Sequence, residues 1–152
     1  MNELSIKIEH LTKAFDKPVL KDISLDVTNQ SYISIVGASG CGKTTLMNIL
    51  GLVESYDSGS FVFNGKQIKR DGDYARIRRE NIGFVFQNYY LIPHLNVLEN
   101  VKIGMKLSGL NKKEQTEKAL AALESVGLRN MTKKKSRQLS GGQAQRVAIA
   151  RA

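Results

Sequence analysis

Residues 37–44, which read Gly-Ala-Ser-Gly-Cys-Gly-Lys-Thr, constrain the possible fold more than any other stretch of the chain. Residues 32–36, directly before them, are short, apolar and β-branched, which predicts a buried parallel strand. Residues 45–52, directly after them, carry apolar side chains at helical spacing, with Gly51 near the end. The pattern therefore predicts a strand, a glycine-rich loop and a helix in direct succession.

This stretch fits the spacing G-x-x-x-x-G-K-[ST] of a phosphate-binding loop. Its glycines remove the Cβ atoms that would hold a phosphate away from the backbone, and successive N–H groups can then converge on it at the positive end of a helix dipole. A lysine adds positive charge, and the Thr44 hydroxyl is placed to ligate Mg²⁺. The residues expected to hold a nucleotide's phosphates are Gly37, Ser39, Gly40, Cys41, Gly42, Lys43, Thr44 and Thr45.

Composition is that of an ordinary soluble globular domain, since 41% of the 152 residues are hydrophobic and 24% are charged. No apolar run approaches the roughly 18 residues that span a bilayer, and residues 1–3 do not open a secretion signal. We therefore expect a cytosolic chain, unless a partner holds it at a membrane. The single Cys41 excludes an internal disulfide. It is either a reactive thiol that ATP protects or a small residue that the loop merely tolerates.

A net charge of +9 raises three possibilities: solvated faces that attract a nucleotide, attraction to a membrane surface, or binding to nucleic acid. The basic residues are spread along the chain, with short clusters only at residues 76–79 and 133–135. Neither cluster is interleaved with aromatic residues, as a base-stacking platform would be. The first possibility is favoured, and no nucleic-acid partner is expected.

The N-terminal half predicts an antiparallel sheet around the loop. Residues 4–10 alternate apolar and polar side chains, as do residues 19–27 after a turn at Lys17-Pro18. Residues 60–63 form a further strand that leads into Asn64-Gly65, a strong hairpin signal. A charged helix is expected over residues 73–80. Residues 81–86 then predict a second buried strand that ends at Gln87.

From Asn96 onward the pattern becomes helical. Two apolar stripes are expected to form a core: Val97, Leu98, Val101 and Met105, and then Ala119, Leu120, Leu123 and Val126. Asn111 and Glu114 predict a capping box, and Gly127 is placed to end that helix. Residues 139–143 (Leu-Ser-Gly-Gly-Gln) form a second Ser/Gly-rich turn, in which Ser140 can cap the helix that follows and the glycines admit an anion.

In this order, the phosphate loop, Gln87 and the sequence LSGGQ at 139–143 resemble the ATP-binding cassette (ABC) family of transporter ATPases, over essentially the whole chain. Residues 83–93 and 98–101 resemble the macrolide-exporter, lipoprotein-release and cell-division subgroup, whose members work with an FtsX-like permease. The resemblance implies an α/β fold. Its P-loop NTPase core and antiparallel β-subdomain would cover residues 1–95, a helical subdomain residues 96–138, and the signature and its helix residues 139–152.

The resemblance also implies ATP and Mg²⁺ as cofactors, with Lys43 on the phosphates and Thr44 on the metal. Gln87 would reach the metal and the attacking water. Phe15 stands where the family stacks adenine, although it could equally be a core residue. The signature residues expected to contact the γ-phosphate bound to an opposite subunit, in a head-to-tail dimer, are Ser140, Gly141, Gly142 and Gln143. The expected location is the cytoplasmic face of the cell membrane, beside a permease.

The family continues past the signature helix to an Asp, a Glu and a His that complete its catalytic site, and residues 1–152 hold no counterpart of them. We therefore expect a fragment that binds ATP weakly and hydrolyses it poorly. Two alternatives remain. One is a cassette that acts on nucleic acid or ribosomes, which the short spacings from Lys43 to Gln87 and from Gln87 to Ser140 disfavour. The other is an ATP-dependent regulator of a membrane partner that drives no transport.

Overall fold

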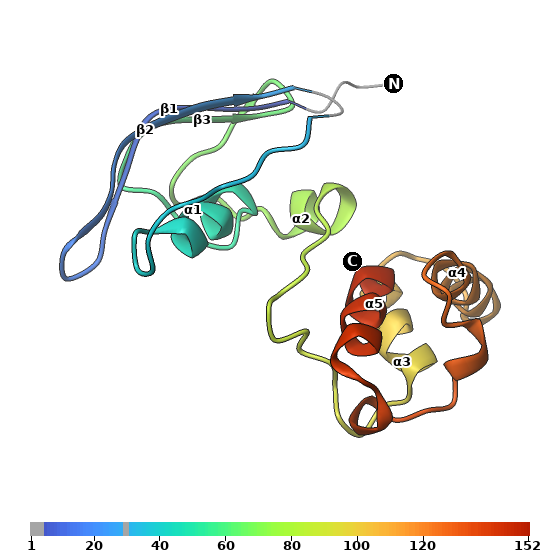
Figure 1. Cartoon of the computed structure of the whole chain (residues 1–152). Coiled ribbons are helices and arrows are strands. Elements are labelled where there is room, and N and C mark those ends of the chain that lie inside the picture. Colours follow the sequence, from blue (N-terminus) through green and yellow to red (C-terminus); the bar gives the residue numbers. More distant parts are fainter. Residues whose placement is uncertain (1–4, 29–30) are drawn as a thin grey trace. The chain divides into compact units, whose positions relative to one another are not determined.

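The computed structural model describes residues 5–28 and 31–152, which divide into two compact units, one up to Ile82 and one from Gly83 to Ala152. The first unit combines an antiparallel sheet with two short helices, and the second is built from helices alone (Figure 1). Each unit has a hydrophobic core of its own.

The sheet of the first unit has the strand order β2-β1-β3-β4, with every neighbouring pair antiparallel. The strands are β1 (Ile6–Ala14), β2 (Pro18–Val27), β3 (Ser58–Phe63) and β4 (Lys66–Gln67). The predicted antiparallel sheet and its hairpin at Asn64-Gly65 are confirmed. Both hairpin residues take left-handed conformations, with φ of 49° and 72°, as a tight two-residue turn requires. Leu4, at the start of the first predicted strand, lies outside the described residues.

A β-bulge makes β1 longer than the alternation of its sequence suggests. Ile8 and Leu11 are both buried although they stand three residues apart, because the register shifts between them. His10 lies in the bulge at φ 51°, opposite Asp22 of β2 at φ 54°, and the His10 Nδ1 lies 2.6 Å from the Asp22 Oδ1. The extra residue changes the phase of the strand and returns its apolar side chains to the core face.

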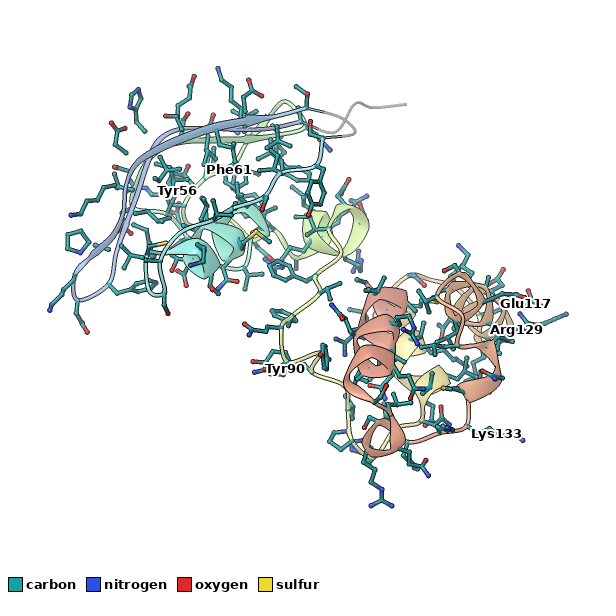
Figure 2. All side chains as sticks on the ribbon, in the orientation of Figure 1. Tyr56, Phe61, Tyr90, Glu117, Arg129 and Lys133 are labelled. Carbon is teal, nitrogen blue, oxygen red and sulfur yellow. The ribbon has the colours of Figure 1, made fainter. Side chains whose placement is uncertain are left out.

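Two helices accompany the sheet, α1 (Lys43–Leu50), which ends at Gly51, and α2 (Ala75–Asn81). Leu46 and Ile49 of α1 are buried against the sheet. Figure 2 shows the rings of Tyr56 and Phe61 on the same side of the sheet as α1, and their centroids lie 6.5 Å apart in an edge-to-face arrangement. The described core residues of this unit are Ile8, Leu11, Leu20, Leu46, Ile49, Leu52, Tyr56, Phe61, Phe63 and Ile68.

The two buried parallel strands predicted at residues 32–36 and 81–86 are wrong. Neither stretch pairs with another strand within the described ranges, and Asn81 belongs to α2. Tyr32 is 95% exposed and Val36 is 84% exposed, and Ile35 alone among residues 32–36 packs against the core while partly buried. A strand exists only where neighbouring backbones accept and donate its hydrogen bonds, and the antiparallel sheet supplies none to either stretch.

The second unit contains the helices α3 (Val97–Lys102), α4 (Lys112–Ser125) and α5 (Gly141–Arg151). Three 3₁₀ turns link them: η1 (Ile103–Met105), η2 (Arg129–Met131) and η3 (Ser136–Gln138). The core that they share contains the first expected apolar stripe and the second apart from Leu120. Its buried members are Val97, Val101, Ala119, Leu123, Leu128 and Val147.

Capping boxes begin all three of these helices. Asn96 pairs with Glu99, Asn111 with Glu114, and Ser140 with Gln143, each pair exchanging two side-chain-to-backbone hydrogen bonds. The capping box predicted at Asn111 is therefore confirmed, and Gly127 follows the end of α4 with φ 71°, as expected of a residue that terminates a helix.

Asn100 is a buried polar residue whose side chain organises the loop before α3. Its Oδ1 accepts the Ile92 N–H at 2.7 Å. Its Nδ2 lies 3.0 to 3.3 Å from the carbonyl oxygens of Ile92, Leu95 and Asn96, and donates to them. Because the amide is only 1% exposed, these bonds replace the water that it would otherwise bind.

Candidate nucleotide-binding site

Gly42 fixes the geometry of the predicted phosphate loop. It is the residue before α1 and takes a left-handed conformation with φ 96°. A Cβ at this position would lie 2.8 Å from the Leu20 Cδ2 and 3.1 Å from the Val19 carbonyl oxygen. Both the backbone conformation and the close approach of β2 therefore require glycine.

The start of α1 is open to a ligand. Gly42 has no side chain to cap it, and no side-chain cap is found for α1 among the described residues. The first N–H groups of a helix have no partner inside the helix, and they lie at its positive end. Residues 43–45 supply these groups, and Thr44 among them is exposed. An anion with several acceptor oxygens can satisfy them together.

Lys43 lies folded over the loop. Its Nζ donates to the carbonyl oxygens of Gly37 at 2.9 Å and Ala38 at 2.6 Å, and lies 3.8 Å from the Cys41 Sγ. The ammonium group is thus held within the loop by two backbone carbonyls and the Cys41 sulfur, all of which are weaker partners than a phosphate. Gly37, Ser39, Gly40 and Cys41 are all exposed around it.

Phe15 lies in the turn between β1 and β2, four residues before Val19, whose carbonyl oxygen lies close to Gly42. It is 57% exposed, so it is not a core residue. The Lys13 Nζ lies 5.1 Å from the centre of its ring. Lys13 is itself buried, and its ammonium group lies 3.0 Å from a Glu54 carboxylate oxygen and 3.5 Å from one of Asp57. A fixed cation thus supports the ring by a cation–π contact and leaves much of the aromatic surface open for stacking.

Gln87 belongs to the second unit and stands in a turn, not at the end of a strand as predicted. The Tyr89 N–H donates to the Phe86 carbonyl at 3.0 Å and closes the turn around it. Phe86 stacks on Phe84 with ring centres 4.9 Å apart, and meets the ring of Tyr90 edge-on at 5.2 Å. The Gln87 side chain is exposed, between aromatic residues that lie against one another.

The predicted signature turn caps α5. The Gln143 N–H donates to the Ser140 Oγ at 3.3 Å, and the Ser140 N–H donates to the Gln143 Oε1 at 3.0 Å. Gly141 and Gly142 are exposed, and a Cβ on Gly142 would meet nothing within 4 Å. The turn therefore presents a helix start whose third N–H is already bonded.

The structure brings the predicted site residues together in two groups. Phe15 and residues 37–45 lie in the first unit, whereas Gln87 and residues 140–143 lie in the second. In the second group, Tyr89 links the two motifs, because its hydroxyl would lie 3.7 Å from a Cβ on Gly141.

Sequence reasoning missed two residues with evident roles. Lys13 supports Phe15, and a lysine two residues before an aromatic residue is a signal that could have suggested the cation–π contact. Arg151 donates to the carbonyl oxygens of Tyr90 at 2.7 Å and Tyr89 at 2.6 Å. It left no such signal, since the contact is made to backbone atoms far away in the sequence.

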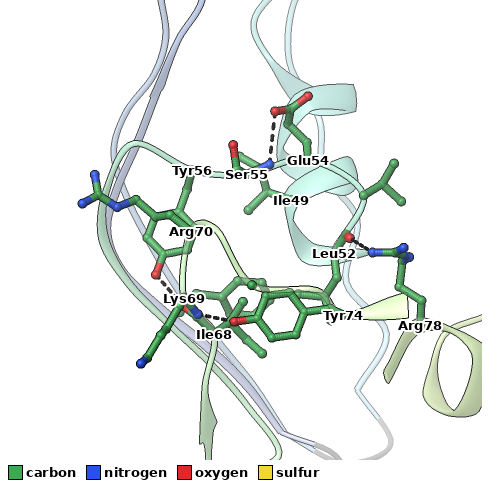
Figure 3. A pocket seen from close by; sticks show the side chains of 13 residues that line it. Ile49, Leu52, Glu54, Ser55, Tyr56, Ile68, Lys69, Arg70, Tyr74 and Arg78 are labelled. Carbon is green, nitrogen blue, oxygen red and sulfur yellow. Dashed lines mark hydrogen bonds between the residues drawn. The ribbon is translucent and has the colours of Figure 1, made fainter. Parts of the chain in front are cut away.

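The first unit also contains a cavity of about 320 Å³ away from the phosphate loop, between α1 and α2 (Figure 3). The Tyr56 hydroxyl donates to the Ile68 carbonyl, and the Tyr74 hydroxyl accepts from the Lys69 N–H. Arg78 donates to the Leu52 carbonyl at 2.6 Å. The Tyr56, Tyr74 and Arg78 side chains thus already form hydrogen bonds to backbone groups beside the cavity. We therefore interpret the cavity as a packing feature and not as a ligand site.

Comparison with known proteins identifies the family. The model of the family described as "ABC transporter" matches residues 20–152. The chain belongs to the ABC transporter family. Its fold is that of the ATP-binding cassette: the structure titled "Dimeric Structure of MJ0796, a Bacterial ABC Transporter Cassette" superposes with a TM-score of 0.86 at 36% identity, covering 96% of this chain and 68% of that one.

Among the relatives of this ABC chain are exporters and lipoprotein-release proteins, the subgroup that the sequence indicated. It is 42% identical to the macrolide export ATP-binding/permease protein MacB of Pasteurella multocida, over all of this chain and 24% of the relative. It is also 42% identical to the lipoprotein-releasing system ATP-binding protein LolD of Bacteroides thetaiotaomicron, over 97% of this chain and 69% of the relative. The chain thus spans about a quarter of the length of the MacB relative.

Proposed function

We propose that this chain is the ATP-binding part of an ABC transporter in which binding and hydrolysis of Mg-ATP drive an FtsX-like permease. The observation that carries the proposal is the uncapped start of α1 behind Gly42, with Lys43 held over the loop by two carbonyl groups and the Cys41 thiol and by no carboxylate. A triphosphate can take over the Lys43 ammonium and the first N–H groups of α1 at once, because its oxygens carry full negative charge.

The proposed roles follow the chemistry of phosphoryl transfer, which depends on positioning and on neutralising charge. Lys43 and the N–H groups of residues 39–45 hold the phosphates. The exposed Thr44 hydroxyl is a hard oxygen ligand of the kind that Mg²⁺ takes beside phosphate oxygens, and the ion neutralises charge there. Phe15 stacks on adenine above Lys13, and Gln87 orients the metal and the attacking water.

The signature residues Ser140, Gly141, Gly142 and Gln143 are proposed to contact the γ-phosphate held by a second cassette. Support comes from the MJ0796 cassette, whose structure is described as dimeric. In a head-to-tail pair, each ATP would lie between a phosphate loop and a signature turn, so closure of the pair would depend on the nucleotide. The proposed division into a core with β-subdomain (1–95), a helical subdomain (96–138) and a signature segment (139–152) assigns these parts to separate roles.

For residues 1–152 alone we propose binding of Mg-ATP with slow turnover. Among the residues that the structure describes, no group of three His, Cys, Asp or Glu side chains could hold a metal ion. In this proposal Thr44, Gln87 and the phosphates hold the metal.

A permease partner is proposed at a shallow groove of about 280 Å³ in the second unit, lined in part by Tyr89, Leu91, Pro93 and Ala144. Over the described ranges, no helix has the length and apolar character needed to cross a membrane. The MacB relative's printed name joins an ATP-binding part to a permease, which supports a partner of that kind. The chain would then act at the cytoplasmic face of the membrane.

Protection of Cys41 from alkylation tests the nucleotide site directly, because this thiol is exposed inside the loop. Mg-ATP and Mg-tripolyphosphate should both slow the reaction of the 152-residue chain, and Lys43→Ala should remove that protection. Equal alkylation with and without Mg-ATP at millimolar concentration would contradict the proposal. For the partner, crosslinks from Pro93→Cys to a copurified permease support transport, and their absence in a competent membrane preparation counts against it.

A further inference from the structure

The backbone around Gln87 takes a conformation that its own residues do not favour. Tyr89 and Tyr90 are both left-handed, with φ of 57° and 43°, which is uncommon for residues with bulky side chains. Two such residues in succession persist only when surrounding groups hold them. The Tyr89 N–H bonds within the turn, to Phe86, and the Tyr90 N–H to Asn88. The two carbonyl groups need partners from elsewhere.

Arg151 provides both partners. One guanidinium nitrogen donates to the Tyr90 carbonyl at 2.7 Å and the other to the Tyr89 carbonyl at 2.6 Å. A planar fork of two N–H donors suits adjacent acceptors, and no other side chain offers this geometry with a permanent charge. Partial burial lowers the pKa of Arg151. A guanidinium nevertheless remains charged at physiological pH, so it needs these carbonyl groups as much as they need it.

The last turn of α5 is closely surrounded. A Cβ on Gly104 would lie 2.7 Å from the Arg151 carbonyl oxygen, and one on Gly83 would lie 2.8 Å from the carbonyl oxygen of Ala152. Both distances are shorter than real Cβ contacts, so the backbones of residues 83 and 104 lie against this end of the helix. The backbone of Arg151 is therefore held in place, so its side chain can restrain the turn at Tyr89 and Tyr90.

The opposite end of α5 is the signature turn, capped by Ser140. Tyr89 reaches this end too, because its hydroxyl would lie 3.7 Å from a Cβ on Gly141. One residue of the Gln87 turn thus contacts the helix twice: its carbonyl meets Arg151, and its ring lies beside the signature glycine. Helix α5 has buried anchors between these points, Val147 and Ala148.

We propose that Arg151 is a positioning residue for Gln87, and that its two hydrogen bonds make the Gln87 turn and the signature helix move as one body. The inference rests on the proposed function, in which Gln87 orients the metal and the attacking water. Arg151 itself touches neither. Its clamp sets the conformation of the backbone two residues after Gln87, and with it the direction from which the Gln87 amide reaches the nucleotide. A movement of about 1 Å at such a group can cost 100-fold in rate.

Amide hydrogen exchange of the 152-residue chain tests the clamp without any nucleotide. Arg151→Ala should speed exchange of the Tyr89 and Tyr90 amides at least tenfold, and Arg151→Lys, which offers one compact cation instead of a fork, should give an intermediate rate. Arg129→Ala is the matched control, because it removes an exposed guanidinium paired with Glu124 at the surface of the same unit (Figure 2). Unchanged exchange at Tyr89 and Tyr90, or an equal increase throughout α3 and α4, would overturn the inference.

Turnover gives a second readout, measured in the natural polypeptide that carries this sequence. Arg151→Ala should lower kcat for ATP by about 10- to 100-fold with KM nearly unchanged, because phosphate binding is left intact. Arg151→Lys should recover part of the loss. A change in KM alone would overturn the positioning role. So would an equal further loss of kcat when Arg151→Ala is added to Gln87→Ala, since a positioning residue has no effect once its target is gone.

The proposed nucleotide site and the proposed role of Arg151 can be contradicted independently. If wild-type Cys41 is not protected by Mg-ATP, the proposed nucleotide site is wrong, whatever the exchange rates show. If Cys41 is protected equally in wild type and Arg151→Ala while exchange and kcat do not change, the proposed function stands and the role of Arg151 is wrong.

Discussion

Gly42 and Ser140 occupy the same position in two helices, directly before the first helical residue, and they treat the helix start differently. Gly42 is left-handed and offers no side chain, so the first N–H groups of α1 face outward without a cap. Ser140 is extended and exchanges two hydrogen bonds with Gln143, so α5 starts with a complete capping box. Both turns are rich in glycine, and both are followed by eight or more helical residues.

The difference concerns what each turn needs from a ligand. In the proposed function, a phosphate supplies the cap that α1 lacks, so the helix start itself would favour its binding. At α5 an anion finds the third N–H already satisfied, and can use the first two or must displace the Ser140 hydroxyl. A turn with its own cap needs no ligand to complete its hydrogen bonds, which agrees with the proposed contact to a nucleotide bound by a second cassette. The following predictions test this contrast, beginning with the largest effect.

Gly42→Ala should destabilise the first unit by about 2–4 kcal/mol and abolish protection of Cys41, because φ 96° is unfavourable for alanine and the new Cβ meets the backbone of Val19. Gly142→Ala is the control: its Cβ would enter open space, and its stability should change by less than about 1 kcal/mol. Urea denaturation measures both. Equal losses for the two variants would remove the contrast between the turns.

Lys43→Ala should weaken Mg-ATP binding by about 10- to 100-fold, the value of one or two charge-assisted hydrogen bonds. Stability should change little, because the ammonium group bonds to the carbonyls of Gly37 and Ala38 and to the Cys41 sulfur within an exposed loop. Titration calorimetry compares the two proteins. Lys66→Ala, on the exposed strand β4, removes an equal charge away from the loop and should leave affinity unchanged.

Ser140→Ala should cost about 1 kcal/mol of stability, as expected when an N-cap hydroxyl is lost. Ser140→Thr retains the hydroxyl and should retain most of the stability. Asn111→Ala is a matched comparison in an equivalent box at the start of α4. Thermal denaturation measures the stability of all three variants. If Ser140→Ala were as stable as the wild type while Asn111→Ala were not, the role of Ser140 as a helix cap would be contradicted.

Lys13→Met has the smallest expected effect on binding. It should lower affinity for Mg-ATP about threefold, the size of one cation–π contact, and leave affinity for Mg-tripolyphosphate unchanged. Phe15→Leu should act in the same direction, since both changes affect only the adenine end. A parallel loss for tripolyphosphate would show that Lys13 acts on the loop instead.

Local patterns allowed correct prediction wherever the decisive partners stand close in sequence. The Asn64-Gly65 hairpin, the Asn111 box and the Ser140 cap each depend on residues within four positions of one another, and all three are present. The same holds for the glycine at position 42, although its contact with β2 could be seen only in the structure.

The failures share a different cause. Residues 32–36 have the composition of a buried strand, yet composition shows only that a stretch can pair, and no strand of the antiparallel sheet lies beside it. The register shift at His10 depends on the twist of two strands together. Arg151 donates to backbone carbonyl groups, which every residue has. The side chains at positions 89 and 90 therefore give no signal from which this contact could be predicted.

The buried amide of Asn100 shows that a change of one atom can remove several hydrogen bonds at once. Deamidation to aspartate would exchange one NH₂ group for oxygen and keep the shape of the side chain. Three carbonyl oxygens that now receive hydrogen bonds would then face an oxygen in a space closed to water. Deamidation at this one atom would therefore remove the hydrogen bonds that hold the loop between Ile92 and Asn96.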